Sequence, residues 1–447
     1  MSHTTIPSNR GSLRRSGRNL LKLLGGKVIN VPIGLLQISL TIHLLGDKGY
    51  GFLILLHSFY QTIGDIAEFQ SWQTVLHYGI KPYEDRNIPL LQRVLRFTFL
   101  LDFCSSIASL VISFLCAVYF SRLLGWPAEW HYLGVFYSFS AFFMTSATFN
   151  GILRLLNRYD LIAIQGLIST SIRLLGIIFL MLIGGGLAGA VGVWMLAVIV
   201  SFCSFLIFSL YQLHRHQLLK GFFTGINEGL TKDLPGIWKF AWNTNLNMTF
   251  SLAYKQITTL VIGGTLGPIA AGYYNIANKI AEAMAKPIVL LQSTLYPEMV
   301  RSWQGSKPSH LYKMALQITA LTGGITTVVL LILPYIAVPI MHLLLHKDPP
   351  PETLILLYWL AGGELVLIWG MSLEPILITT DNTAGAIYAR GMDVLFFLPM
   401  LFIFIKWWGM DGVGPATVIA AFLLIFLQAF FILYGRKQRT RSQKLSS

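Results

Sequence analysis

The stretch that decides the fold class is residues 187–212, LAGAVGVWMLAVIVSFCSFLIFSLYQ, which contains no charged side chain. A helix needs about 20 apolar residues to cross the hydrocarbon layer of a bilayer. Similar stretches recur along the whole chain, at approximately 28–46, 52–78, 94–120, 132–153, 160–184, 239–264, 270–298, 312–342, 353–379, 384–407 and 412–434. The sequence therefore predicts an all-α integral membrane protein with about 12 transmembrane helices.

Composition supports a membrane protein and argues against a soluble one. Hydrophobic residues make up 54% of the 447 positions and charged residues 12%, whereas soluble domains carry about 25% charged residues. The net charge of +14 would suit a nucleic-acid-binding protein. The basic residues, however, lie in short stretches between apolar segments, so we expect membrane lipid around the chain and no nucleic acid.

The distribution of basic residues predicts the orientation. If the N-terminus is cytoplasmic and the spans alternate, 23 Lys and Arg residues fall on the cytoplasmic side and 4 (Lys48, Arg122, Lys347 and Lys406) on the other. This asymmetry agrees with the positive-inside rule. We therefore expect both termini in the cytoplasm.

An internal repeat predicts two halves. The turn that contains Gly46 and Tyr50 recurs around Gly267 and Tyr273, and the glycines around Gly186 recur 223 residues later. Chance likeness between glycine-rich turns is the alternative. Duplication of a six-helix unit predicts two like-oriented bundles, 1–212 and 239–447, related by a pseudo-two-fold axis along the membrane normal. Residues 213–238 would be a cytoplasmic linker between them.

One predicted span carries a polar stripe. Asn275, Lys279, Glu282 and Lys286 are spaced by four, three and four residues, which places them on one helix face. Charged groups inside a membrane are costly and usually face a bundle interior or a watery cavity. We therefore expect Asn275, Lys279 and Lys286 to bind substrate in a lumen, although a Glu282–Lys286 ion pair would explain the same spacing.

Other mid-membrane charges extend this set. Arg173 and Lys255 have no carboxylate three or four residues away and are predicted to bind substrate. Candidate ion-coupling carboxylates are Asp65, Glu68, Glu282 and Glu364, which makes coupling to H⁺ or Na⁺ the expectation in place of a bound cofactor. Charged residues nearer the predicted helix ends, namely Arg96, Asp102, Glu374 and Asp393, are expected to reach water.

Enzymatic motifs are absent from the sequence. It contains no P-loop, no G-x-S-x-G, no H-E-x-x-H and no Cys/His spacing typical of a metal site. We therefore expect neither an enzyme nor a metal-binding protein.

Several motifs resemble those of the polysaccharide and O-antigen flippases of the Wzx type, within the multidrug/oligosaccharidyl-lipid/polysaccharide superfamily. They are LLGDKGYGFL at 44–53, GILRLLNRYD at 151–160, the L-G-x-x-x-x-G-Y-Y-N-x-A-x-K pattern at 266–279, and LYPEM at 295–299. One departure is Lys255, since many relatives carry an aspartate near this position.

The resemblance implies a flippase in the bacterial inner membrane that moves a polyprenyl-pyrophosphate-linked oligosaccharide outward by alternating access. The product would pass to polysaccharide polymerase machinery. Cations at 173, 255, 279 and 286 would suit a pyrophosphate or acidic sugars. The alternatives are a small-molecule or drug/cation antiporter of the same superfamily and a membrane enzyme of glycan assembly.

Overall fold

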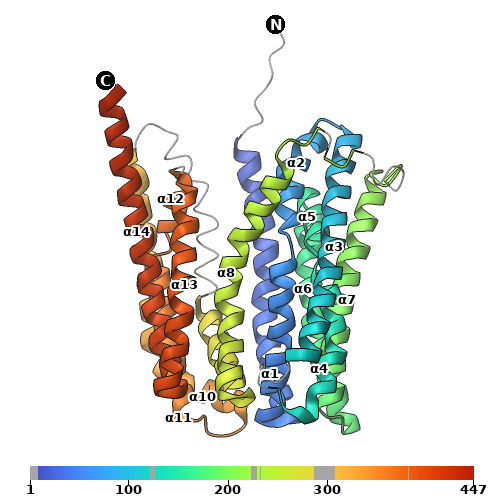
Figure 1. Ribbon diagram of the computed structural model, residues 1–447, viewed down its shortest axis with the longest axis vertical. Coiled ribbons are helices and arrows are strands. Elements are labelled where there is room, and N and C mark those ends of the chain that lie inside the picture. Colours follow the sequence, from blue (N-terminus) through green and yellow to red (C-terminus); the bar gives the residue numbers. More distant parts are fainter. Residues whose placement is uncertain are drawn as a thin grey trace. The chain divides into compact units, whose positions relative to one another are not determined.

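A computed structural model of the chain is almost entirely helical in the part that it describes, which is residues 9–120, 126–222, 229–231, 233–285, 308–380 and 382–446. Long helices run roughly parallel within each half of the chain (Figure 1). They are α1 (Asn9–Ala67), α2 (Ser71–Glu84), α3 (Ile88–Phe120), α4 (His131–Ser138), α5 (Ala147–Leu155), α6 (Tyr159–Ile183), α7 (Leu187–Arg215), α8 (Ile237–Leu266), the helix over 268–285, α10 (Pro308–Leu345), α11 (Pro351–Trp369), α12 (Leu373–Thr379), α13 (Thr383–Trp408) and α14 (Val413–Ser446). Short 3₁₀ turns join some of them: η1 (Ala128–Trp130), η2 (Phe139–Met144) and η3 (Gly409–Gly412).

These helices account for the predicted spans within the described residues; the span predicted at 270–298 is described only as far as residue 285. Six stretches of the described chain are long and apolar enough to cross a membrane by length and composition: Ile88–Tyr119, Tyr159–Ile183, Leu187–Arg215, Tyr312–Leu345, Pro351–Ile378 and Ala384–Gly435. The last of these holds both α13 and the apolar part of α14. The other spans are shorter, broken or more polar. The prediction of an all-α membrane protein with about twelve spans is confirmed.

The chain forms two compact units that do not follow a single cut in the sequence. Unit 1 comprises Met1–Leu44, Phe59–Arg122 and Pro127–Thr249, and unit 2 comprises Leu45–Ser58, Leu123–Trp126 and Phe250–Ser447. A short piece of the first half, 45–58, thus belongs to the unit built from the second half. The boundaries 1–212, 213–238 and 239–447 remain a prediction about the domains.

The chain enters unit 2 at a kink in α1. Gly46 has φ 66° and ψ 177° there, which lie outside the helical region. A side chain with a Cβ is strained at such a positive φ, and glycine is not. The connector predicted between the first two spans is therefore a single sharp bend between two helical segments, where a longer loop had been expected.

Two predicted spans are broken near their middles. In the span predicted at 132–153, α4 passes into the 3₁₀ turn η2, and α5 begins only at Ala147. In the span predicted at 353–379, α11 ends at Trp369 and α12 begins at Leu373. At this second break Ser372 contacts the Thr319 hydroxyl at 2.8 Å and donates to the Ala315 carbonyl at 3.2 Å. Each break exposes helix ends inside the bilayer, where their backbone groups need partners from the protein.

The segment that was predicted to be a linker packs against α3 of unit 1. Gln92 donates to the carbonyls of Leu218 and Lys220 at 2.7 and 2.8 Å. Arg96 donates to the Phe222 carbonyl at 2.6 Å and also to that of Gly221. Arg96 was expected to reach water, and the structure uses it to fix this segment.

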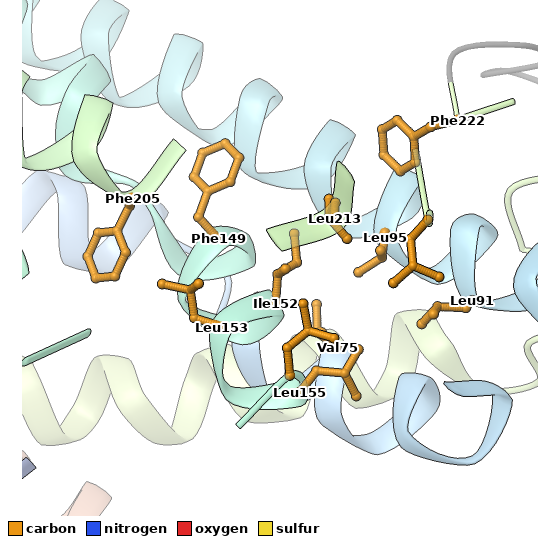
Figure 2. Packing of buried hydrophobic residues seen from close by; sticks show 12 residues of the cluster. Val75, Leu91, Leu95, Phe149, Ile152, Leu153, Leu155, Phe205, Leu213 and Phe222 are labelled. Atoms are coloured by element: carbon orange, nitrogen blue, oxygen red, sulfur yellow. The ribbon is translucent and has the colours of Figure 1, made fainter. Parts of the chain in front are cut away.

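The described part of the segment also enters the hydrophobic core of unit 1. Leu218 and Phe222 join a cluster of buried side chains from α2, α3, α5 and α7 that includes Val75, Leu91 and Leu153. Figure 2 shows Val75, Leu91, Leu153 and Phe222 within this cluster, on separate segments of the chain. Burial of this apolar surface anchors the segment to unit 1.

Candidate functional site

The most developed polar site in unit 1 is at the start of α5. A carboxylate oxygen of Glu68 accepts from the backbone N–H of Ser146 at 2.9 Å. Asp102, from α3, accepts from the N–H of Thr148 at 2.7 Å and from the Ser71 hydroxyl. Two carboxylates from different segments therefore hold one helix N-terminus.

The physical reason is the break in this span. The first N–H groups of a helix have no partner within the helix, and the helix dipole makes that end attractive to negative charge. In water, solvent would satisfy these groups. Inside a membrane the protein must do so, and here Glu68 and Asp102 do.

Other polar side chains surround this site. Gln61 donates to Asp65 at 2.7 Å, one helical turn before Glu68. From α8, Asn245 donates to the backbone carbonyl of Glu68 at 3.2 Å, and Thr249 donates to Asn245 at 3.1 Å. Of the predicted ion-coupling residues, the structure thus brings Asp65 and Glu68 into one hydrogen-bonded region of unit 1.

Arg173 lies elsewhere in unit 1, against an aromatic ring. Its guanidinium carbon is 4.4 Å from the centroid of the Trp194 ring, which comes from α7. Such a contact stabilises a desolvated cation by about 2 kcal/mol. Among the described residues, no acceptor reaches the buried Nε atom of Arg173. A negatively charged group could accept a hydrogen bond from this Nε atom and balance the charge of the guanidinium.

Unit 2 holds the remaining described candidates. Asn275 accepts from the Tyr50 hydroxyl at 3.1 Å, so its side chain is engaged by the 45–58 segment. Glu282 accepts from Asn278 at 2.7 Å. Lys279 and Glu364 are partly buried, and each also interacts with its surroundings.

Two predicted cations receive no structural account. Lys286 lies outside the described residues, and for Lys255 only the backbone, within α8, is described. The substrate-binding roles assigned to Arg173, Lys255, Lys279, Lys286 and Asn275 stay predictions, as do the ion-coupling roles of Asp65, Glu68, Glu282 and Glu364.

Two carboxylates that were expected near water are buried. Asp102 is 7% exposed and Asp393 is 4% exposed, and no described donor reaches one of the carboxylate oxygens of Asp393. The expectation was wrong for Asp102 because α3 begins at Ile88, six residues before the predicted span. Asp102 then lies about 21 Å along the helix at 1.5 Å per residue. Had the start of this helix been placed directly after the charged residues 85–86, the sequence would have predicted a buried position for Asp102.

The GILRLLNRYD motif forms the turn between α5 and α6. Asn157 adopts φ 56° there, and Arg158 pairs with Asp160 at 2.8 Å. This hydrogen bond raises the pKa of Arg158. Gly151 packs so closely that a Cβ would lie 2.8 Å from the Trp72 Cα. The motif therefore has a structural role in joining α2, α5 and α6.

Comparisons with known proteins agree with this fold. The "Inner membrane protein YghQ" of Escherichia coli (strain K12) is 28% identical over 333 residues, which is 74% of this chain and 93% of that protein. A multidrug resistance MATE family transporter of the MOP superfamily, in an inward-facing conformation, superposes with a TM-score of 0.76 at 15% identity and covers 94% of this chain and 96% of its own. The lipid II flippase MurJ, in an inward closed conformation, superposes with a TM-score of 0.69 at 16% identity. This match covers 91% of this chain and 86% of the MurJ chain.

A family model decides the affiliation. The model described as "Polysaccharide biosynthesis protein" matches residues 16–303, a range that includes all four motifs on which the resemblance was based. The fold is that of the MOP transporters named above. The chain belongs to the polysaccharide biosynthesis protein family, as its motifs indicated.

Proposed function

We propose that this protein is a flippase that moves a polyprenyl-pyrophosphate-linked oligosaccharide, such as an O-antigen or exopolysaccharide repeat unit, across the bacterial inner membrane. The family match and the fold shared with MurJ and MATE transporters support a transporter of lipid-linked or amphipathic substrates. The similarity to an E. coli protein named as an inner membrane protein supports the location. A polysaccharide polymerase would use the product at the outer face.

One observation carries the substrate class. Arg173 is a cation without a carboxylate partner among the described residues, and its Nε is buried and unsatisfied beside Trp194. Burying such a group is costly unless a ligand completes it. A pyrophosphate or an acidic sugar has the charge and the acceptor oxygens to do so, while the prenyl chain remains in lipid.

The energetics favour outward movement of an anion. A cytoplasm-negative potential of 100 mV contributes about 2.3 kcal/mol for each negative charge that leaves. Alternating access between two units would expose the cations first to one side of the membrane and then to the other. Coupling to H⁺ or Na⁺ would use the carboxylates Asp65, Glu68, Glu282 and Glu364, and we add Asp102 as a candidate because it shares the N-terminus of α5 with Glu68.

Surface glycan in a deletion strain that carries single variants tests the proposal. Arg173→Ala, Lys255→Ala and Lys279→Ala should each reduce export while the protein accumulates normally in the membrane. Arg215→Ala, at the exposed end of α7, is the matched control and should export normally. Wild-type surface glycan in all three variants would remove the cation hypothesis.

A drug/cation antiporter is the second candidate, because MATE transporters share the fold and the α5 site is acidic. The two functions make opposite predictions for Arg173. Neutralising this residue would remove repulsion from an organic cation, so Arg173→Ala should preserve or improve cation efflux from energised vesicles. Loss of glycan export without any cation efflux favours the flippase.

A further inference from the structure

Three polar side chains from distant parts of the chain meet at one corner of unit 2. Asp47 follows the kink at Gly46, Tyr273 belongs to the helix over 268–285, and Lys347 follows α10. The Tyr273 hydroxyl donates to Asp47 Oδ2 at 2.7 Å, and Lys347 Nζ pairs with the same oxygen. The hydrogen bond to Asp47 raises the pKa of Lys347.

Close packing next to this cluster fixes the rest of the 45–58 segment. A Cβ added to Gly51 would lie 1.9 Å from the Pro268 carbonyl oxygen, and one added to Gly272 would lie 3.0 Å from the Gly51 Cα. Tyr50, which donates to Asn275, is 1% exposed. Gly51 leaves no room for a Cβ, and at Gly272 a Cβ would fit only if the neighbouring backbone shifted.

The polar cluster differs from this packing because water reaches it. The side chain of Lys347 is 46% exposed and that of Asp47 is 22% exposed. Solvated ion pairs are weak, and removing one changes an equilibrium by at most about fivefold. A contact of this strength adds to the packing that holds the segment and can still open repeatedly during transport.

We propose that Asp47, Tyr273 and Lys347 form a latch that holds residues 45–58 in unit 2, and that the latch must open once in each transport cycle. The second part rests on the proposed function. The positions of the two charges agree with this role, because both Asp47 and Lys347 lie in connectors predicted to face away from the cytoplasm. The 45–58 segment is also the longest piece of the first half of the chain that is assigned to unit 2.

Thiol labelling tests the latch without any substrate. Leu53 is fully buried in the segment, so Leu53→Cys, in a background with Cys104, Cys116 and Cys203 replaced by serine, reports its release to a membrane-impermeant maleimide. Asp47→Asn and Lys347→Gln should each increase the labelling rate, by up to about fivefold. The charge swap, Asp47→Lys with Lys347→Asp, should restore slow labelling. Asp348→Asn is the control, since that side chain is 98% exposed.

A reversible cross-link tests whether opening is required. Asp47→Cys with Lys347→Cys, in the same cysteine-free background and joined by a short bis-methanethiosulfonate reagent that spans the length of the lysine side chain, should stop glycan export, and reductant should restore it. The latch is refuted if Asp47→Asn and Lys347→Gln leave the labelling rate unchanged, and its required opening is refuted if the cross-linked protein exports normally. If labelling responds but deleting the gene leaves surface glycan unchanged, the latch stands and the proposed flippase function fails.

Discussion

Asp102 offers the sharpest test of the polar site at the start of α5. Its carboxylate accepts from the Thr148 N–H and from the Ser71 hydroxyl, and both partner residues are at most 1% exposed. Asp102→Ala removes the acceptor and leaves two buried donors without a partner. Asp102→Asn keeps one carbonyl oxygen and the size of the side chain.

The magnitude follows from these contacts. Each buried donor left unsatisfied costs about 1–3 kcal/mol, so the gross loss in Asp102→Ala is about 2–6 kcal/mol. Removing a buried carboxylate recovers part of this, because its own desolvation penalty disappears. We expect a net loss of about 3 kcal/mol in the free energy of unfolding for alanine, and about half of that for asparagine.

Unfolding in mixed micelles, with increasing denaturing detergent and tryptophan fluorescence as the signal, measures this loss. Glu374→Gln is the control, since Glu374 pairs with Arg390 at 2.6 Å but is 34% exposed. Solvated pairs contribute about 0–1 kcal/mol. A loss below about 0.5 kcal/mol in Asp102→Ala would show that α5 does not depend on this carboxylate.

Two further predictions concern the packing around the site. Gly151→Ala should destabilise the protein by about 1–3 kcal/mol through overpacking against α2. The control is Gly192→Ala, where a Cβ meets nothing within 4 Å, so this variant should gain up to about 1 kcal/mol from helix propensity. Equal unfolding curves for the two variants would contradict this prediction. Arg96→Ala should free the docked segment and speed tryptic cleavage after Lys220 severalfold. Arg93→Ala, which loses only an exposed contact, should cleave at nearly the wild-type rate.

Much of the fold was predictable because a bilayer imposes simple requirements. Uncharged stretches as long as 187–212 have no alternative to spanning helices, and family motifs such as GILRLLNRYD indicated the affiliation. The breaks before Ala147 and Leu373 were not predicted. No proline lies near the break before Ala147, and its partner Glu68 is far away in sequence. The break before Leu373 has Pro375 in the first turn of α12, a signal that was available in the sequence.

The candidate site was predicted only in part. Glu68 was identified because charge inside a span is unusual, but the same reasoning missed Asp102, whose depth depends on where α3 begins. The stripe periodicity placed Asn275 and Glu282 on one helix. It could not show that Asn275 binds Tyr50, since that contact depends on the 45–58 segment joining the second unit.

Unit 2 combines an early segment of the chain, 45–58, with the second half, and this has a consequence for how the protein is made. Tyr50 leaves the ribosome 225 residues before its partner Asn275, which corresponds to about 10–45 s at ordinary rates of synthesis. During that interval the 45–58 segment is already in the membrane without the helices that later bury it. Biogenesis must therefore keep this early segment from making wrong associations until residue 275 has been made, and chains truncated before residue 268 should be prime targets for membrane proteolysis.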